Sequence, residues 1–206
     1  MKIAVVGAGG IGSLFGGRLA AAGHCVWLVH RRPEVVAALR AHGLRLDSAD
    51  GSEQIRLNAT TDTREVGEVD LVLVLTKSND TRAAAEASRA LVGTETLVLT
   101  LQNGLGNEAV LGEVLGPERV LMGMTYAGAA FVAPGHVRHT APGATFVGDL
   151  SAAPGRAQRL ARTFSQAGLP TSVAHDLWSE VWGKLLINAA MNATCALTGA
   201  RLLSQT

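Results

Sequence analysis

The fold is decided by Lys2-Ile3-Ala4-Val5-Val6-Gly7-Ala8-Gly9-Gly10-Ile11-Gly12, an apolar run that leads directly into a Gly-x-Gly-x-x-Gly string. Residues 1–6 have the apolar character of a buried parallel strand. Residues 13–22 carry the small and apolar side chains of a helix that packs closely on a sheet. Together these segments predict the strand, turn and helix of a Rossmann-type α/β fold, although a purely structural strand-turn-helix is the alternative.

The spacing of the three motif glycines favours a site for a dinucleotide. Gly7 permits a tight turn, Gly9 lets backbone N–H groups approach a pyrophosphate, and Gly12 allows the helix to lie against the strand. The N-terminus of that helix directs the positive end of its dipole at the phosphates. The predicted cofactor loop consists of Gly7, Ala8, Gly9, Gly10, Ile11 and Gly12.

The residues after the second predicted strand bear on which dinucleotide is bound. Residues 25–29 are apolar, and His30-Arg31-Arg32 follows them where NAD-preferring proteins usually place an acidic residue. Arginine can instead hold a 2′-phosphate through its fork of donors. We therefore predict NADP(H) as cofactor, with Arg31 and Arg32 as contacts. The alternative is that both are solvated residues before a helix that begins at Pro33.

Length and composition restrict the function further. A chain of 206 residues accommodates one full domain and an appendage. A net charge of +1 without a basic block argues against nucleic acid as a partner. No segment has the apolar length of a membrane span, and no metal-type spacing is present. Cys25 and Cys195 lie in apolar segments, so we expect reduced core residues of a cytoplasmic protein.

Alternating strands and helices predict a doubly wound, parallel sheet. Residues 69–76 and 96–101 are expected strands, and the alanine-rich residues 81–91 an expected helix. Lys77 and Asn103 directly follow the two strands, at the edge where ligands of open α/β sheets bind. Each also has an ordinary interpretation, as a solvated lysine and as part of an Asn-Gly turn.

The pattern changes between residues 120 and 148, where short extended pieces alternate with glycine and proline. We expect these pieces to be the antiparallel closing part of the sheet. His136 and His139 are not expected to bind a metal, because residues three apart on a strand point to opposite faces. An amphipathic helix is predicted over residues 154–168, and the domain boundary close after it, at residue 170.

The last predicted helix carries an unusual line of polar residues. Asp176 can cap a helix through residues 177–192, on which Lys184, Asn188 and Asn192 recur every four residues after Glu180. Amides and an ammonium within an otherwise apolar helix need partners, which favours a functional site. The alternative is that the line faces solvent.

The motifs in this order resemble those of the ketopantoate reductases, also called 2-dehydropantoate 2-reductases. The resemblance extends over essentially the whole chain. It rests on Gly7-x-Gly9-x-x-Gly12, Lys77, Gln102-Asn103-Gly104-x-Gly106, Arg138-His139-Thr140 and Glu180-x-Trp182-x-Lys184-Leu185-x-x-Asn188-x-x-x-Asn192.

The resemblance implies an NADP-dependent oxidoreductase that acts on CH–OH groups and reduces ketopantoate to pantoate in pantothenate biosynthesis. It implies that Lys184 polarises and protonates the ketone oxygen, a role suited to an ammonium near a developing alkoxide. By the same resemblance Asn188 and Asn192 orient the substrate, a small 2-keto acid. The implied contacts on the cofactor side are Lys77, Asn103, which lies between cofactor and substrate, and the main chain around Ala129.

One departure from the family pattern concerns the C-terminal part. Members of the family continue into a helical domain, whereas this sequence stops at Thr206, so we expect a cofactor domain over residues 1–170 and the beginning of a helical domain over residues 171–206. The apolar side of residues 177–203 would be exposed, so either a second chain covers it or the sequence is part of a longer protein; we expect self-association, with a homodimer as the candidate assembly. A strictly monomeric species in sedimentation would contradict this. A reductase of another 2-keto acid and a non-catalytic NADP(H)-binding module remain as alternative functions.

Overall fold

The computed structural model describes residues 1–151 and 155–199, and within these ranges its main sheet has eight strands. Neighbouring strands run parallel except for β8 and β11, which pair antiparallel. This confirms the predicted doubly wound sheet. In spatial order the strands are β12 (Thr171–Val173), β11 (Thr145–Asp149), β8 (Val120–Thr125), β7 (Leu97–Thr100), β6 (Leu71–Val74), β1 (Lys2–Val6), β2 (Cys25–Val29) and β5 (Asn58–Thr60).

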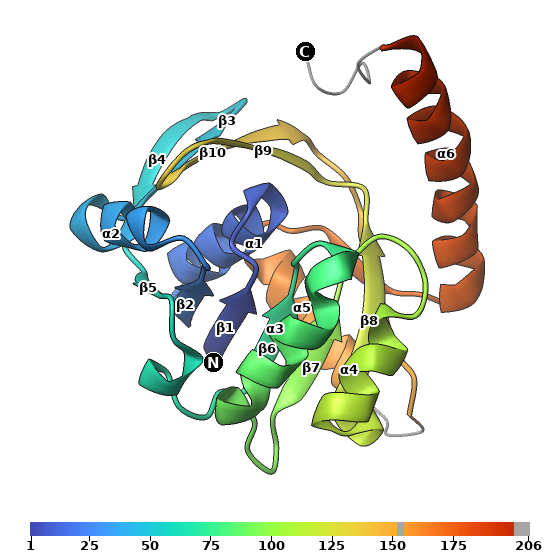
Figure 1. The fold of residues 1–206 in the computed structure, drawn as a ribbon, viewed down its shortest axis with the longest axis horizontal. Helices are drawn as coiled ribbons and strands as arrows, with labels where there is room; N and C mark the ends of the chain where they lie inside the picture. The colour runs from blue at the N-terminus through green and yellow to red at the C-terminus, as the bar shows by residue number, and fades with distance from the viewer. Residues whose placement is uncertain (152–154, 200–206) are drawn as a thin grey trace.

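Helices cover both faces of the main sheet (Figure 1). On one face lie α1 (Gly10–Ala21) and α5 (Arg156–Gln166), whose Phe15 and Phe164 rings meet edge to face with centroids 5.7 Å apart. On the other face lie α3 (Thr81–Ala87) and α4 (Asn107–Leu115), which share a core cluster with β6 and β7. Every residue of β6 and β7 is buried, which explains why both strands are apolar except for Thr100 at the end of β7.

A second, four-stranded sheet arches over α1 (Figure 1). Its strands, in order, are β4 (Gly51–Ile55), β3 (Leu44–Ser48), β10 (His136–Ala141) and β9 (Gly128–Ala133), and α2 (Pro33–His42) leads into it. The prediction for residues 120–148 is therefore right for β8 and β11 but wrong for β9 and β10, which leave the main sheet. They leave it because Leu46 and Val137 of the second sheet bury themselves against α1 on the side away from the main sheet.

The long helix α6 (Leu177–Thr198) stands beside the body of the protein and touches it mainly through its first turns (Figure 1). Its N-cap is Asp176 as predicted, since the carboxylate accepts the Ser179 N–H. Leu177 and Val181 pack on Met122 and Met124 of β8, whereas Trp182, Leu186 and Met191 of the same helix are at least 48% exposed. This exposed apolar surface is where the expected self-association would take place, and the self-association stays a prediction.

Two details of the structure bear on the predicted organisation. Thr171–Val173 pairs with β11, so the main sheet includes residues just past position 170, where the domain boundary is predicted. The expectation that both cysteines are core residues is wrong: Cys25, the first residue of β2, is exposed, and Cys195 on α6 is half-buried. Among the described residues, no helix combines the length and the apolar character needed to cross a membrane.

Candidate active site

The glycine loop connects β1 to α1 at the carboxyl end of the main sheet. The N–H groups of Gly7 and Ala8 both donate to the Val29 oxygen of β2, at 3.1 and 3.3 Å. In the described part of the chain, no group accepts a hydrogen bond from the N–H groups of the first three residues of α1, Gly10, Ile11 and Gly12. Three free donors at a helix N-terminus form an arrangement suited to an anionic group such as a pyrophosphate.

The glycines of this loop are needed for different structural reasons. A Cβ at Gly12 would collide with the main-chain oxygen of Gly7, and a Cβ at Gly10 would collide with that of Ala129 on β9. A Cβ at Gly9 would meet no protein atom within 4 Å. Packing therefore requires Gly10 and Gly12, whereas the space beside Gly9 is open, as expected where a ligand approaches the backbone.

A groove of about 370 Å³ runs from the glycine loop past the end of β2 to the loop after β6. Arg31 and Lys77 both border this groove, as the sequence predicts for cofactor contacts. Arg31 lies 3.5 Å from Asp80 on the opposite wall, and both side chains are largely exposed. Such an exposed pair contributes little to stability, so the Arg31 guanidinium is available to an anion.

The structure separates the two predicted arginine contacts. The guanidinium of Arg32 lies 5.3 Å from the centre of the Phe131 ring on β9, and Arg32 does not border the groove. Phe131 also stacks on His30. Burial lowers the pKa of His30, and the positive charges of Arg32 and Arg31 lower it further. The neutral ring accepts the Arg32 N–H at Nδ1, which helps to hold the segment that presents Arg31 to the groove.

Lys184 reaches from α6 to the carboxyl end of β8, where its ammonium donates to the main-chain oxygen of Thr125. Burial lowers the pKa of this lysine. Its side chain borders a hollow of about 160 Å³ that Ile11 of the glycine loop and Asn103 also line. It also borders a second hollow, lined by Asn103 and Asn188. Lys184 thus stands between the glycine loop and the polar residues of α6.

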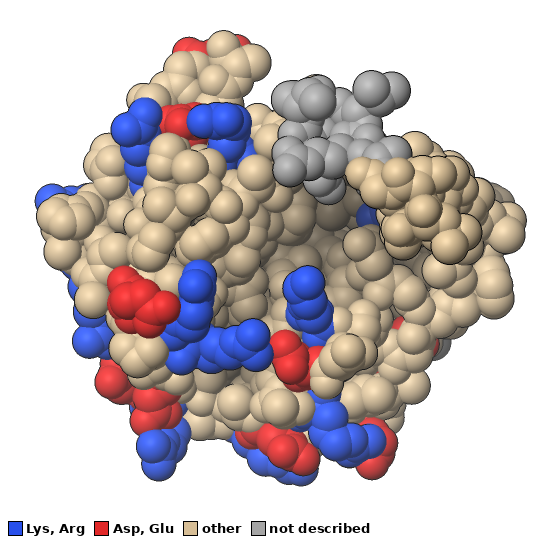
Figure 2. All heavy atoms as spheres, turned by 45° about the horizontal axis from the view of Figure 1, so that its top comes forward, with Lys and Arg blue, Asp and Glu red and all other residues tan. Residues whose placement is uncertain are grey.

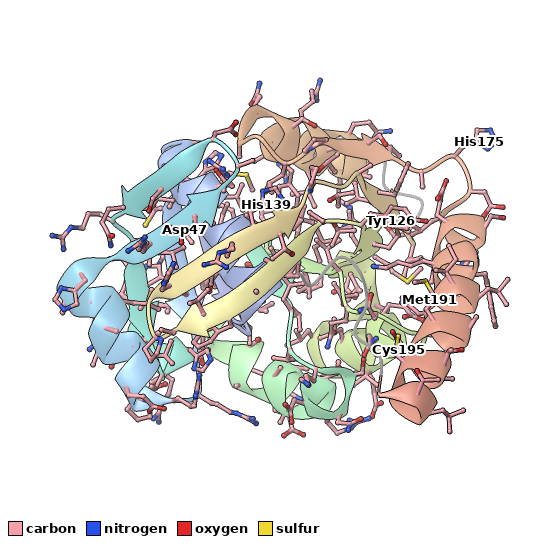
Figure 3. All side chains as sticks on the ribbon, turned by 90° about the horizontal axis from the view of Figure 1, so that it is seen from above. Asp47, Tyr126, His139, His175, Met191 and Cys195 are labelled. Atoms are coloured by element: carbon pink, nitrogen blue, oxygen red, sulfur yellow. The ribbon has the colours of Figure 1, made fainter. Side chains whose placement is uncertain are left out.

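The polar line of α6 is only partly directed at the protein. Glu180, Lys184 and Asn188 are half-buried, but Asn192 is exposed and borders none of these hollows. The structure therefore brings three of the four predicted substrate contacts together, Asn103, Lys184 and Asn188. Figure 2 shows that this face of the molecule is hollowed, and Figure 3 shows Met191 and Cys195 projecting from α6 towards the body of the protein.

Three residues of the site were missed by the sequence interpretation. The Tyr126 ring has its centroid 5.8 Å from the Lys184 ammonium, Glu108 borders the same hollow as Asn188, and Asp80 faces Arg31. Only Asp80 had a local signal, because it lies close behind Lys77 at a strand end. Tyr126 and Glu108 reach the site through tertiary packing, which the sequence pattern does not contain.

The two histidines of β10 lie apart from these hollows. His136 Nε2 is 2.7 Å from a carboxylate oxygen of Asp47 on β3, and Nε2 of His139 is buried with no hydrogen-bond partner among the residues described. Within residues 1–151 and 155–199, no three His, Cys, Asp or Glu side chains come together as a group that could hold a metal ion.

Known proteins match this chain over most of its length. Residues 3–152 match the family described as Ketopantoate reductase PanE/ApbA. The 2-dehydropantoate 2-reductase of Halobacterium salinarum is 42% identical over 200 residues, which are 96% of this chain and 65% of that protein. The chain spans 62% to 65% of the length of this and two further curated relatives.

Two solved structures are similar in fold as well as in sequence. The crystal structure of 2-dehydropantoate 2-reductase from Geobacter metallireducens has a TM-score of 0.91 at 35% identity and covers 99% of this chain and 70% of its own. A ternary structure of D-mandelate dehydrogenase with NADH and anilino(oxo)acetate has a TM-score of 0.87 at 28% identity. The match covers 95% of this chain and 64% of that chain. The chain belongs to the ketopantoate reductase family.

Proposed function

We propose that this chain carries the dinucleotide site and the acid of an NADPH-dependent reductase that converts 2-dehydropantoate to pantoate in the cytoplasm. The observation that carries the proposal is the place of Lys184, which borders both the hollow beside the glycine loop and the hollow beside Asn188. An ammonium at this junction is within reach of a group that lies between a dinucleotide and polar substrate contacts.

The residues at the carboxyl end of the sheet fit a dinucleotide. The open space at Gly9 and the free N–H groups of Gly10, Ile11 and Gly12 suit the pyrophosphate, and Arg31 suits a 2′-phosphate. Lys77 would contact the cofactor from the loop after β6, and Asn103 and the main chain around Ala129 would border its nicotinamide end. When bound, the reduced nicotinamide supplies a hydride to the keto carbon of the substrate.

Lys184 supplies the proton that balances the reaction. As the keto carbon gains its hydride, negative charge develops on the keto oxygen, and the Lys184 ammonium stabilises that charge and transfers one proton to form the hydroxyl group. The lowered pKa of Lys184 brings this acid nearer to neutral pH. Asn188 would orient the hydroxyl and carboxylate groups of the substrate, and we keep Asn192 as a further candidate contact although it is exposed here.

The proposal is tested by following NADPH oxidation with 2-dehydropantoate and with the 2-keto acid that lacks its hydroxyl group. We expect faster turnover of 2-dehydropantoate, because the amides beside Lys184 recognise polar groups. Binding of NADPH without turnover of either acid would indicate a non-catalytic NADP(H)-binding module instead.

A second candidate is a related reductase with a different 2-keto acid as substrate. The similarity to D-mandelate dehydrogenase favours it, because that protein shares the fold over 95% of this chain. Phenylglyoxylate, the keto acid that corresponds to mandelate, distinguishes the two. Turnover of phenylglyoxylate in preference to 2-dehydropantoate would assign the second function.

The preference between NADPH and NADH should depend on Arg31. We expect Arg31→Ala to raise the dissociation constant of NADPH about tenfold and to leave that of NADH nearly unchanged, because only NADPH carries the 2′-phosphate. Arg32→Ala is the matched control, since Arg32 lies over Phe131 and does not border the groove. Fluorescence titration with both dinucleotides measures the effect, and an equal loss for both in Arg31→Ala would contradict it.

A further inference from the structure

A cluster of buried polar side chains lies beneath the two loops that carry Lys77 and Asn103. The exposed fractions are 9% for Gln102, 2% for Thr81, 6% for Asn107 and 2% for Thr100. None of these side chains is charged, but all four are polar. Buried amides and hydroxyls destabilise a protein unless they are hydrogen-bonded, so the bonds they form indicate what the cluster holds together.

Gln102, just after β7, connects this strand to the loop after β6. Its Nε2 lies 3.0 Å from the main-chain oxygen of Thr76 and 2.9 Å from Oγ1 of Thr81, and it donates to both. Its Oε1 accepts the hydroxyl proton of Thr100 at 3.0 Å. The amide therefore ties the end of β7 to both ends of the loop that contains Lys77.

Thr81 continues the connection into the loop that contains Asn103. Its hydroxyl lies 2.9 Å from the Ser78 oxygen and 2.9 Å from Oδ1 of Asn107, either of which can accept its proton. Nδ2 of Asn107 donates to the Asn103 oxygen at 3.2 Å, and the Ser78 hydroxyl donates to the same oxygen at 3.0 Å. The bonds form a closed circuit that joins the two loops.

Thr81 is the member of this circuit that most clearly acts through others. Lys77 and Asp80 border the groove and Gln102, Asn103 and Asn107 border the hollows, whereas Thr81 borders neither. Thr81 ends the loop that contains Lys77, and its hydroxyl bonds to both ends of the loop that contains Asn103, because it accepts from Gln102 and can donate to Asn107. We propose that Thr81 is a positioning residue that, through Gln102 and Asn107, fixes Lys77 and Asn103 for dinucleotide binding. This inference rests on the proposed function.

Three variants test the proposal. Thr81→Val removes the hydroxyl at nearly constant shape, and Thr81→Ser keeps it. Thr96→Val is the matched control: Thr96 is also buried, and its hydroxyl accepts the Gly93 N–H and donates to the Val69 oxygen, but it precedes β7 at the end of the strand away from the site. Each variant is compared with the unchanged chain in its dissociation constant for NADPH and in its melting temperature.

We expect Thr81→Val to raise the dissociation constant about tenfold and Thr81→Ser to stay within about twofold of the unchanged chain. Thr96→Val should lower the melting temperature by about as much as Thr81→Val does, and it should keep the affinity for NADPH. Unchanged affinity in Thr81→Val, or an equal loss in Thr96→Val, would overturn the proposal. Should Thr81→Val fail to fold, Ser78→Ala removes an exposed link of the same circuit and should weaken binding about threefold; unchanged affinity there would equally overturn the proposal.

Amide hydrogen exchange separates this proposal from the proposed function. If the unchanged chain does not bind NADPH, the proposed function fails, but exchange in residues 76–81 and 102–107 still reports whether the circuit holds the two loops. Faster exchange in both loops of Thr81→Val, and in neither loop of Thr96→Val, supports the positioning role. Exchange that is unchanged in Thr81→Val overturns it.

Discussion

Replacement of Lys184 by methionine should lower kcat for the keto acid about a thousandfold while the dissociation constant of NADPH changes little. Methionine nearly preserves the length and packing of the side chain but can neither donate a proton nor stabilise a developing alkoxide. Lys2→Met is the matched control, because Lys2 also donates from Nζ to a main-chain oxygen, that of Val66, near the opposite end of the sheet. Steady-state kinetics with 2-dehydropantoate measure the loss.

The lowered pKa of Lys184 adds a pH dependence to this prediction. Burial favours the neutral amine, so the ammonium loses its proton at a lower pH than an exposed lysine would. Reduction that uses this proton should therefore decline on the alkaline side of its pH profile, at a pH below the ordinary pKa of lysine. A profile in which the alkaline limb survives unchanged in Lys184→Met would assign that limb to another group.

The same shift gives Lys184→Met an expected effect on stability. Because the pKa is lower in the folded state, the unfolded chain binds this proton more tightly, and the unfavourable contribution is complete below the folded-state pKa. It disappears as the pH rises through the unfolded-state pKa. Near neutral pH we thus expect Lys184→Met to melt at or above the temperature of the unchanged chain. A marked loss of melting temperature would show that the bond to Thr125 outweighs the desolvation of the ammonium.

Substitution of Gly9 by alanine should raise the dissociation constant of the dinucleotide about a hundredfold and leave the fold intact. Gly9 has a φ of −76°, which any residue adopts, and its Cβ would meet no protein atom within 4 Å. The added methyl group would therefore obstruct only what binds beside the loop. Fluorescence titration with NADPH and thermal unfolding measure the two parts of this prediction.

Two other glycines supply controls for Gly9→Ala. Gly183 on α6 also has open space around its Cβ, so Gly183→Ala should keep dinucleotide affinity and stabilise the helix by about 1 kcal/mol. Gly12→Ala should instead destabilise the fold by about 2 kcal/mol or more, because its Cβ would collide with the Gly7 oxygen. If Gly9→Ala binds the dinucleotide as well as the unchanged chain, the open space beside Gly9 is not where the pyrophosphate lies.

The main sheet was predictable because its strands carry their own signals. The runs that became β1, β6 and β7 are almost entirely apolar since parallel strands are buried on both faces, and Asp176 precedes its helix as a capping residue should. The second sheet had no such signal. The residues of β4 are mostly exposed. The parallel partner of β3 is β10, which lies far away in the chain, so only tertiary packing determines the pairing of these two strands.

The candidate site was predictable to a similar extent. The strand-end rule correctly placed Lys77 and Asn103 at one edge, and helical spacing placed Lys184 and Asn188 on one face. The same spacing did not reveal that Asn192 lies beyond the part of α6 that contacts the body. The side chains of Arg31 and Arg32 point in different directions because the Arg32 guanidinium lies over the ring of Phe131, a residue of the second sheet.

The arrangement of the second sheet over α1 has a consequence for the order of events in folding. Asp47 of β3 and His136 of β10 are bonded although they are 89 residues apart in the chain, and β9 closes against Gly10 at the start of α1. Contacts between such distant segments form slowly, because the entropy of closing the intervening chain is lost before the contact is gained. The helix α1 is thus among the last elements of this domain to be enclosed, and the glycine loop at its start takes its final surroundings only late in folding.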